Sequence, residues 1–152
     1  LLALALGARA RPAGRKEIGW APLRMRSAAR EDPLLASLPD DPMVFHWHGD
    51  VFDLPSGAVS LAGSDQSEHQ IFRVGDSVYG FLCHMEVTCG VVEAMVREFE
   101  DEWRQAGADG EAILSEARAL LPVLNEHGAR LFAAWTERWA NGLVRGTGLD
   151  RA

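Results

Sequence analysis

The first half of the chain consists of short apolar runs separated by turn residues, a pattern typical of β-strands. Val, Ile, Phe and Trp dominate these runs, which suits residues on a pleated and half-buried surface. A Gly-Asp-Ser sequence at residues 75–77 predicts a hairpin between the last two runs. The strands that the pattern predicts span residues 18–25, 43–47, 59–62, 70–74 and 78–83.

Polar and small residues predict how these strands are connected. Residues 48–50 (His-Gly-Asp) and residues 55–57 (Pro-Ser-Gly) each favour a turn. Residues 9–16 are basic and contain Gly and Pro, so we expect a loop there. Residues 33–38 favour a short helix, and residues 1–6 are good helix formers.

After residue 86 the apolar spacing changes from alternation to the three- and four-residue steps of a helix. We expect helices over residues 91–105, 111–121 and 124–143, with interruptions at Pro122 and Gly128. The chain is therefore predicted to be a strand-rich part followed by a helical part.

Composition narrows the class of protein. The chain has 152 residues, of which 47% are hydrophobic and 24% charged, as expected for one globular domain. Its net charge of −7 disfavours nucleic-acid binding, because an acidic surface repels phosphates. No apolar run is long enough to cross a bilayer, so no membrane partner is expected. Two cysteines cannot build a disulfide framework, which favours a reducing, cytoplasmic location.

The chain begins at Leu1 within an apolar run, and this start has two interpretations. Residues 1–6, followed by Ala-Arg-Ala at residues 8–10, could be the end of a signal peptide in a secreted domain. Alternatively, residues 1–6 are the body of a helix whose beginning precedes Leu1. We favour the second interpretation because of the family resemblance described below.

His84 and Glu86 form the first candidate for chemistry. They are two residues apart, so on an extended segment they share a face, at the point where a hydrophobic strand ends. A carboxylate beside an imidazole fixes its tautomer and raises its basicity, as a general base requires. The alternative is an ordinary surface pair. Cys83 would lie on the opposite face of the strand, which favours a core role for its thiol over a Cys–His dyad.

A second candidate comprises His46, His48 and Asp50, which also alternate along the chain. Such a group could ligate a metal, with His69 or His84 as a further ligand. The second ligand cluster that most hydrolytic metal sites need is missing, however. We therefore expect no metal and no cofactor, and interpret these residues as a polar strand end that leads into a turn.

Three segments of the sequence resemble the class I glutamine amidotransferases. Residues 45–58 (FHWHGDVFDLPSGA) are similar to the segment that follows a core strand in that family. Residues 78–88 (VYGFLCHMEVT) are similar to its closing signature, in which a strand delivers His, one spacer and Glu. Residues 16–23 (KEIGWAPL) match the GMP synthase-like branch. The three motifs follow the family's order and spacing, and the match ends near Thr88.

The resemblance implies a flavodoxin-like α/β fold, here incomplete at its N-terminus and followed by a helical C-terminal tail. Residues 1–104 would be the C-terminal portion of the amidotransferase domain, and residues 105–152 a helical extension. In the family, a Cys-His-Glu triad hydrolyses the glutamine side-chain amide to glutamate and ammonia. Residues 1–7 are similar to the helix that follows the cysteine-bearing elbow, so we expect the nucleophile to precede Leu1.

The resemblance also assigns roles to residues of this chain. It makes His84 the general base and Glu86 its orienting group. It further implies a turn whose backbone groups contact glutamine, formed by Trp47, His48, Gly49 and Asp50.

Two departures from the family pattern affect packing beneath the base. Cys83 stands where the family usually has an aromatic residue, and Leu82 stands where Gln is common. Neither Cys83 nor Cys89 matches the nucleophile, so the chain alone is expected to be inactive. The predicted partners are glutamine as substrate and an ammonia-accepting synthetase. The alternative is a non-catalytic α/β binding module or pseudoenzyme subunit.

Overall fold

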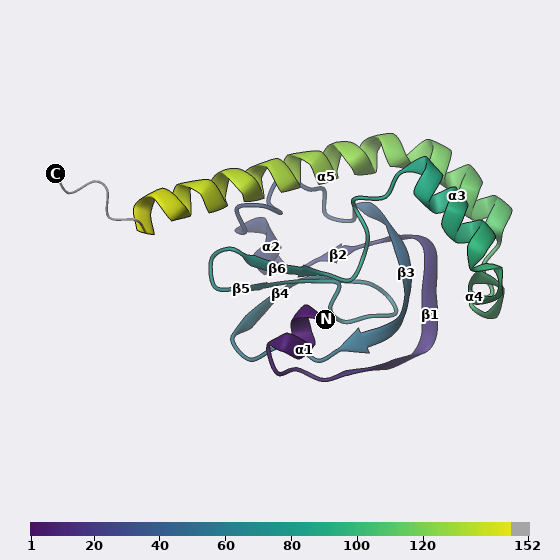
Figure 1. Cartoon of the computed structure of the whole chain (residues 1–152), viewed down its shortest axis with the longest axis horizontal. Coiled ribbons are helices and arrows are strands. Elements are labelled where there is room, and N and C mark those ends of the chain that lie inside the picture. The colour runs from purple at the N-terminus through teal and green to yellow at the C-terminus, as the bar shows by residue number, and fades with distance from the viewer. Residues whose placement is uncertain (147–152) are drawn as a thin grey trace.

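The computed structural model describes residues 1–146 and shows a mixed α/β architecture (Figure 1). Its strands form two sheets, and every strand pair within them is antiparallel. The first sheet pairs β1 (Ala10–Pro22) with β3 (Met43–Phe52). The second has the strand order β2-β4-β5-β6, and its members are β2 (Arg24–Met25), β4 (Ala58–Gly63), β5 (Ile71–Val74) and β6 (Val78–Phe81).

Five helices accompany the two sheets in the described part of the chain. The longest, α5, runs across the sheets along one side of the molecule, and α3 packs beside it (Figure 1). α3 begins after the N-cap Thr88, whose side chain accepts a hydrogen bond from the backbone N–H of Val91. The helices are α1 (Leu2–Ala5), α2 (Ser27–Arg30), α3 (Cys89–Glu98), α4 (Glu100–Gln105) and α5 (Gly110–Gly146).

The hydrophobic core lies between the sheets and one face of α5. Phe45 of β3 and Ile71 of β5 are fully buried in it. α5 contributes buried side chains at steps of three, four and seven residues, which follow one helical face: Ile113, Ala117, Leu121, Leu124 and Leu131. The helix therefore shares the core of the sheets. The predicted boundary between a domain portion at residues 1–104 and a helical extension at residues 105–152 stays a prediction.

Two connections predicted from the sequence are wrong, and the same strand pair explains both. Residues 9–16 belong largely to β1 rather than to a loop, and residues 48–50 lie within β3 rather than in a turn. Residues 10–12 of β1 pair with residues 50–52 of β3, and residues 17–22 pair with residues 43–48. Residues 13–16 and Gly49 lie at the register shift between these two paired regions. The cross-strand hydrogen bonds outweigh the local turn preference of His-Gly-Asp.

The helix predictions also need correction. Residues 33–38 form turns, because Asp32 Oδ1 accepts the backbone N–H groups of Leu34 and Leu35. Residues 91–105 divide into α3 and α4 at Phe99, whose φ of −117° and ψ of 42° are not helical. Conversely, α5 continues through Pro122, which lies on its exposed side, where water can solvate the carbonyl that loses its partner.

The predicted hairpin at residues 75–77 is confirmed. Val74 of β5 pairs with Val78 of β6, and Gly75 has the positive φ of 58° that this turn needs. The turn at residues 55–57 is also confirmed, and it uses Gly57 at φ 75°. These turns fix the register of the second sheet, whose last strand leads directly to His84.

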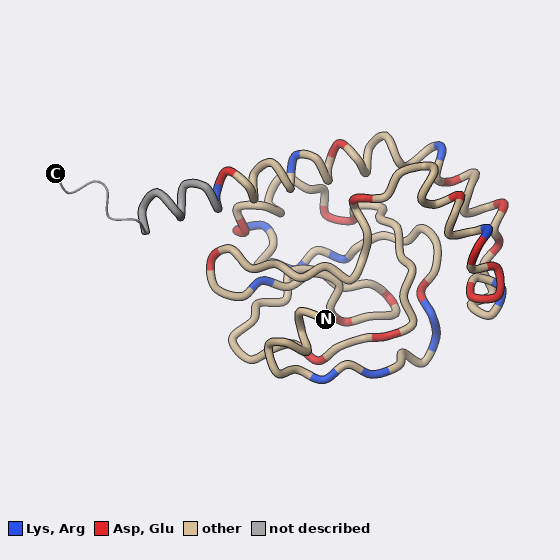
Figure 2. The backbone as a smooth tube through the Cα atoms, in the orientation of Figure 1, with Lys and Arg blue, Asp and Glu red and all other residues tan. Residues whose placement is uncertain are grey.

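Charged residues are unevenly distributed over the fold (Figure 2). Three acidic residues occupy the first turn of α4, Glu100, Asp101 and Glu102, where they interact favourably with the helix dipole. Basic residues follow the outer part of β1: Arg11, Arg15 and Lys16. In residues 1–146, no helix combines the length and the apolar character needed to span a membrane.

Gly128 allows α5 to approach the segment that carries His84. A Cβ at this position would lie 2.5 Å from the carbonyl oxygen of Met85, which is closer than real Cβ atoms come to backbone. We expect Gly128→Ala to lower the free energy of unfolding by about 1–3 kcal/mol, because helix and backbone must separate. Gly90→Ala in α3 is the matched control, since no atom outside its chain neighbours and its own helix backbone lies within 4 Å of its Cβ position. Urea unfolding in which both variants match the parent would contradict this packing.

Candidate active site

The segment after β6 forms no regular strand and pairs with β3 only through an isolated bridge between His84 and Phe45. Cys83, Met85 and Val87 are buried, whereas His84 and Glu86 point away from the core. This two-residue alternation is what an extended backbone produces when one of its faces packs on a core. It places the imidazole and the carboxylate on the same side, as the sequence predicts.

His84 and Glu86 are hydrogen-bonded side chain to side chain. Nδ1 of His84 lies 2.7 Å from Oε1 of Glu86, and the other carboxylate oxygen accepts the backbone N–H of Met85 at 2.9 Å. The His84 side chain is 32% exposed, and its Nε2 takes no part in this contact. Partial burial alone would raise the pKa of Glu86, but these hydrogen bonds outweigh it and hold the pKa below its usual value. The Glu86 carboxylate is therefore ionised at neutral pH.

A backbone bridge ties His84 to β3. The N–H of His84 donates to the carbonyl of Phe45 at 2.8 Å, and the N–H of Phe45 donates back to the carbonyl of His84 at 3.4 Å. Trp47 is two residues beyond Phe45, so both side chains lie on one face of β3, with ring centroids 5.9 Å apart. The bridge thus brings Trp47, from the predicted glutamine-binding segment, to the side of the sheet where His84 lies.

Trp47 is held in place by α4. Its Nε1 donates a hydrogen bond to Oε2 of Glu102 at 3.3 Å, and Nζ of Lys16 lies 3.6 Å from the same oxygen. The ring of Phe99 packs near the indole at a centroid distance of 6.4 Å. Nothing in the local sequence distinguishes Glu102 from the other acidic residues of α4, so this contact could not be predicted.

The other three residues of the predicted binding segment, His48, Gly49 and Asp50, do not share the position of Trp47. Asp50 is exposed at the register position opposite Pro12. Gly49 lies close against the Lys16 side chain, with 3.2 Å between the Cγ of Lys16 and the Cβ position of Gly49. His48 points to the other face of β3 and away from Trp47, as expected for neighbours in a strand. A role of His48 in binding glutamine would therefore involve its backbone.

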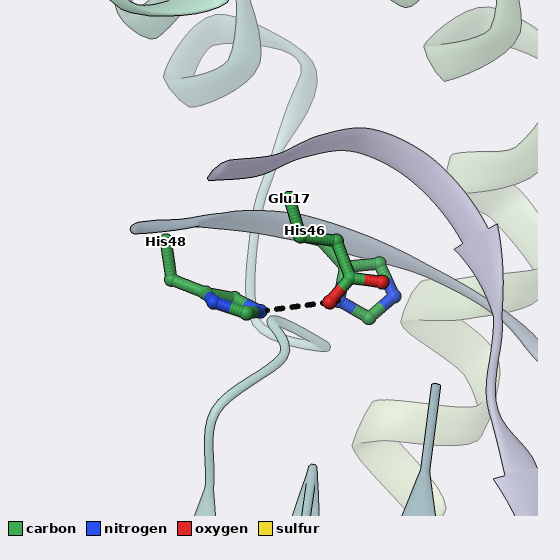
Figure 3. Close-up of side chains that lie close together, drawn as sticks. All are labelled: Glu17, His46 and His48. Atoms are coloured by element: carbon green, nitrogen blue, oxygen red, sulfur yellow. Dashed lines mark ion pairs between the residues drawn. The ribbon is translucent and has the colours of Figure 1, made fainter. Parts of the chain in front are cut away.

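The imidazole of His48 belongs to a buried polar cluster (Figure 3). Its Nε2 lies 3.1 Å from Oε2 of Glu17, and Nδ1 of His46 lies 3.7 Å from the same oxygen. Ser64 and Gln70 donate hydrogen bonds to this oxygen at 2.9 and 2.7 Å. Burial acts to raise the pKa of Glu17, but these neighbours outweigh it and lower the pKa.

The group that the sequence suggests as possible metal ligands, His46, His48 and Asp50, differs from the observed cluster in its third member. Among residues 1–146, the side chains whose ligand atoms converge are Glu17, His46 and His48, within 4.8 Å of one another, and Asp50 is not among them. His69 pairs with Ser60 at 2.9 Å, and His84 pairs with Glu86. Glu17 was missed because its proximity to His48 depends on the pairing of two strands far apart in sequence.

Neither cysteine has the properties of an activated thiol. Cys83 is buried beneath His84, and burial raises its pKa to about 12. Cys89 is exposed in the first turn of α3, where its hydrogen bond to Glu93 raises its pKa. A reactive thiol needs a lowered pKa, so both cysteines are protonated at neutral pH.

No family model matches the chain. A glutamine amidotransferase-like protein of Salmonella typhimurium is 38% identical over 106 residues, which cover 70% of this chain and 44% of that protein. The structure is also similar to a glutamine amidotransferase of Thermotoga maritima, with a TM-score of 0.80 and 30% identity over 90% of this chain and 58% of the other.

Two further structures extend this comparison. A glutamine amidotransferase of Methylobacillus flagellatus gives a TM-score of 0.78 at 25% identity, covering 90% of this chain and 58% of the other. A GMP synthase subunit of Thermoplasma acidophilum gives 0.52 at 25% identity, covering 57% of this chain and 43% of the other.

The chain thus spans about half the length of the proteins that it matches. The mixed α/β fold predicted from the motifs is confirmed, with its C-terminal helix. In sequence and in fold, the chain is similar to glutamine amidotransferase-like proteins, which confirms the resemblance that its motifs predict.

Proposed function

We propose that this chain supplies the general base and its orienting carboxylate for hydrolysis of the glutamine side-chain amide to glutamate and ammonia. The observation that carries the proposal is the 2.7 Å contact between Nδ1 of His84 and Oε1 of Glu86. It leaves Nε2 of His84 as the nitrogen that exchanges protons with the substrate. The Salmonella and Thermotoga proteins, which are named for this activity, support the same reaction class.

The reaction needs a thiol that His84 can serve. The thiolate attacks the amide carbon, and His84 donates a proton to the departing nitrogen, which leaves as ammonia. The resulting thioester is hydrolysed by a water molecule whose proton His84 accepts. Glutamate and the free thiol are then released, so the atoms of one glutamine and one water are accounted for.

We assign the nucleophile to a cysteine other than Cys83 and Cys89. Burial of Cys83 and the Glu93 contact of Cys89 both raise the pKa of the thiol, the opposite of what activation requires. The side chain of Cys83 also lies on the core side of the segment, whereas that of His84 points away. This agrees with the interpretation that the nucleophile of the family precedes Leu1.

Glutamine would bind beside β3, near Trp47. Three contacts support a fixed binding surface there: the bridge of His84 to Phe45, the bond of Trp47 to Glu102, and the packing of Lys16 on Gly49. The ammonia would pass to a synthetase. The likeness to a protein named for GMP synthase favours a separate synthetase chain as that partner.

Replacing the two cysteines tests the assignment of the nucleophile. The assay uses a form of the protein that extends upstream of Leu1 through a cysteine-bearing elbow. We expect Cys83→Ala and Cys89→Ala to leave kcat for glutamine hydrolysis within about twofold, because neither thiol touches the reacting atoms. Glutamate release is measured over a range of glutamine concentrations. If Cys83→Ala abolished it while circular dichroism showed an intact fold, Cys83 would be the nucleophile.

A further inference from the structure

The buried cluster of Glu17, His46 and His48 is a direct product of strand pairing. Glu17 of β1 and His48 of β3 are direct cross-strand partners, so their side chains share one face of this sheet. His46 is two residues before His48 and lies on the same face. This face turns toward the second sheet, where Ser64 follows β4 and Gln70 precedes β5. Glu17, His46 and Gln70 are almost completely buried.

The ligand atoms of this cluster have the spacing of a metal site. Zinc binds imidazole nitrogen and carboxylate oxygen at roughly 2.0–2.2 Å, so neighbouring ligand atoms of a tetrahedral site lie roughly 3.3–3.6 Å apart. Oε2 of Glu17 lies 3.1 Å from Nε2 of His48 and 3.7 Å from Nδ1 of His46. All three ligand atoms lie within 4.8 Å of one another, so modest side-chain rotations would bring them around one ion.

Four buried polar atoms of the cluster have no hydrogen-bond partner of good geometry: both ring nitrogens of His46, Nδ1 of His48 and Oε1 of Gln70. A metal ion would give a partner to the orphaned imidazole of His46. Buried polar atoms without partners are costly and rare. The backbone of Ala21 nonetheless lies near the His46 ring. A histidine that binds a metal through one nitrogen commonly directs the other toward a backbone carbonyl.

The chemistry of the cluster suits a cation. Imidazole nitrogen and carboxylate oxygen are both ligands that zinc accepts in proteins. Glu17 is an acidic side chain in the protein interior, where its relative exposure is 3%. A divalent cation bound between the three side chains would compensate the charge of this carboxylate.

Gln70 offers a fourth ligand. Its Nε2 lies 2.7 Å from Oε2 of Glu17 and 3.1 Å from Nε2 of His48. Rotating the amide by half a turn exchanges its nitrogen and oxygen, which would place Oε1 at this position among the other ligand atoms. Ser64 would remain bonded to Glu17 and hold the ligating carboxylate in place.

We propose that Glu17, His46 and His48 form a buried structural site for one divalent transition-metal ion, with zinc the best match to two imidazoles and a carboxylate. Since the site is closed, the ion would be incorporated as the chain folds and would stabilise the pairing of β1 with β3. This inference does not rest on the proposed glutamine hydrolysis.

Metal content and cobalt spectroscopy test the site in a Cys89→Ala background, which removes the exposed thiol. The protein is expressed with zinc and dialysed against a chelator, and its zinc is measured by mass spectrometry. We expect one zinc ion per chain, and a tetrahedral visible absorption spectrum after refolding with Co²⁺. His46→Gln should lose both signals, whereas His127→Gln, which alters a histidine outside the cluster, should keep both.

A second variant separates loss of the metal from loss of the fold. His46→Cys keeps a metal ligand at this position and should add a thiolate-to-cobalt charge-transfer band that the parent lacks. The proposal fails if the folded parent retains no more zinc than His46→Gln and gives no tetrahedral cobalt spectrum. It also fails if His46→Cys binds cobalt without the new band.

Discussion

Replacing His84 with Asn is expected to lower kcat for glutamine hydrolysis by about 10²–10⁴-fold, the usual contribution of a positioned general acid–base. The variant is made in the form of the protein that extends upstream through the cysteine-bearing elbow. The imidazole would transfer protons both to departing ammonia and from the attacking water, so both half-reactions should slow. Asn keeps the backbone bridge to Phe45, because this bridge uses only main-chain atoms.

The control for this variant is His127→Asn, which replaces a histidine on α5 outside the site. It should hydrolyse glutamine at the parent rate. KM for glutamine should change little in His84→Asn, because the loss concerns transition-state chemistry rather than binding. An unchanged kcat in His84→Asn would remove His84 from the mechanism.

Replacing Glu86 with Gln is expected to cost about 10²-fold in kcat. The comparable change at the buried aspartate of a serine protease triad costs ~10⁴-fold, because the amide favours the wrong imidazole tautomer. The loss should be smaller here, since the Glu86 side chain is 58% exposed and water can partly replace it. His84→Asn should cost at least as much, because Glu86 acts only through the imidazole.

Glu86 is a positioning residue, so its test includes a measurement that reports on His84. Long-range ¹H–¹⁵N NMR should find the proton of the neutral His84 ring on Nδ1 in the parent. In Glu86→Gln the Nε2-protonated tautomer should become populated. Glu93→Gln, which removes an exposed carboxylate on α3, is the matched control and should alter neither kcat nor tautomer. A Glu86→Gln variant with parental tautomer and rate would show that the carboxylate is a surface partner only.

The juxtaposition of His84 and Glu86 could be predicted because it depends on local geometry. Alternation along an extended segment puts residues 84 and 86 on one side whatever the rest of the chain does. The same alternation correctly predicted a core position for Cys83. The hairpin that precedes this segment was predictable as well, since Gly75 supplies the positive φ at its turn.

The buried cluster and the strand β1 could not be predicted in this way. Local signals in residues 48–50 favour a turn, but β1 pairs with these residues over a long sequence separation and keeps them extended. Which residue faces His48 is set by that register alone, so Glu17 could not be identified as its partner. The continuity of α5 through Pro122 has a similar origin, because Leu121 and Leu124 on its two sides pack into one core.

The central claim is that the base and its orienting carboxylate lie in this chain and act on a thiol other than Cys83 and Cys89. The most direct test supplies glutamine labelled with ¹⁵N in its side chain and measures labelled ammonia and glutamate together. The form extended through the cysteine-bearing elbow should release both in equal amounts. The 152-residue chain alone should release neither. Equal rates in the two forms, or no release from either, would contradict the account, and the second result would favour a non-catalytic binding module.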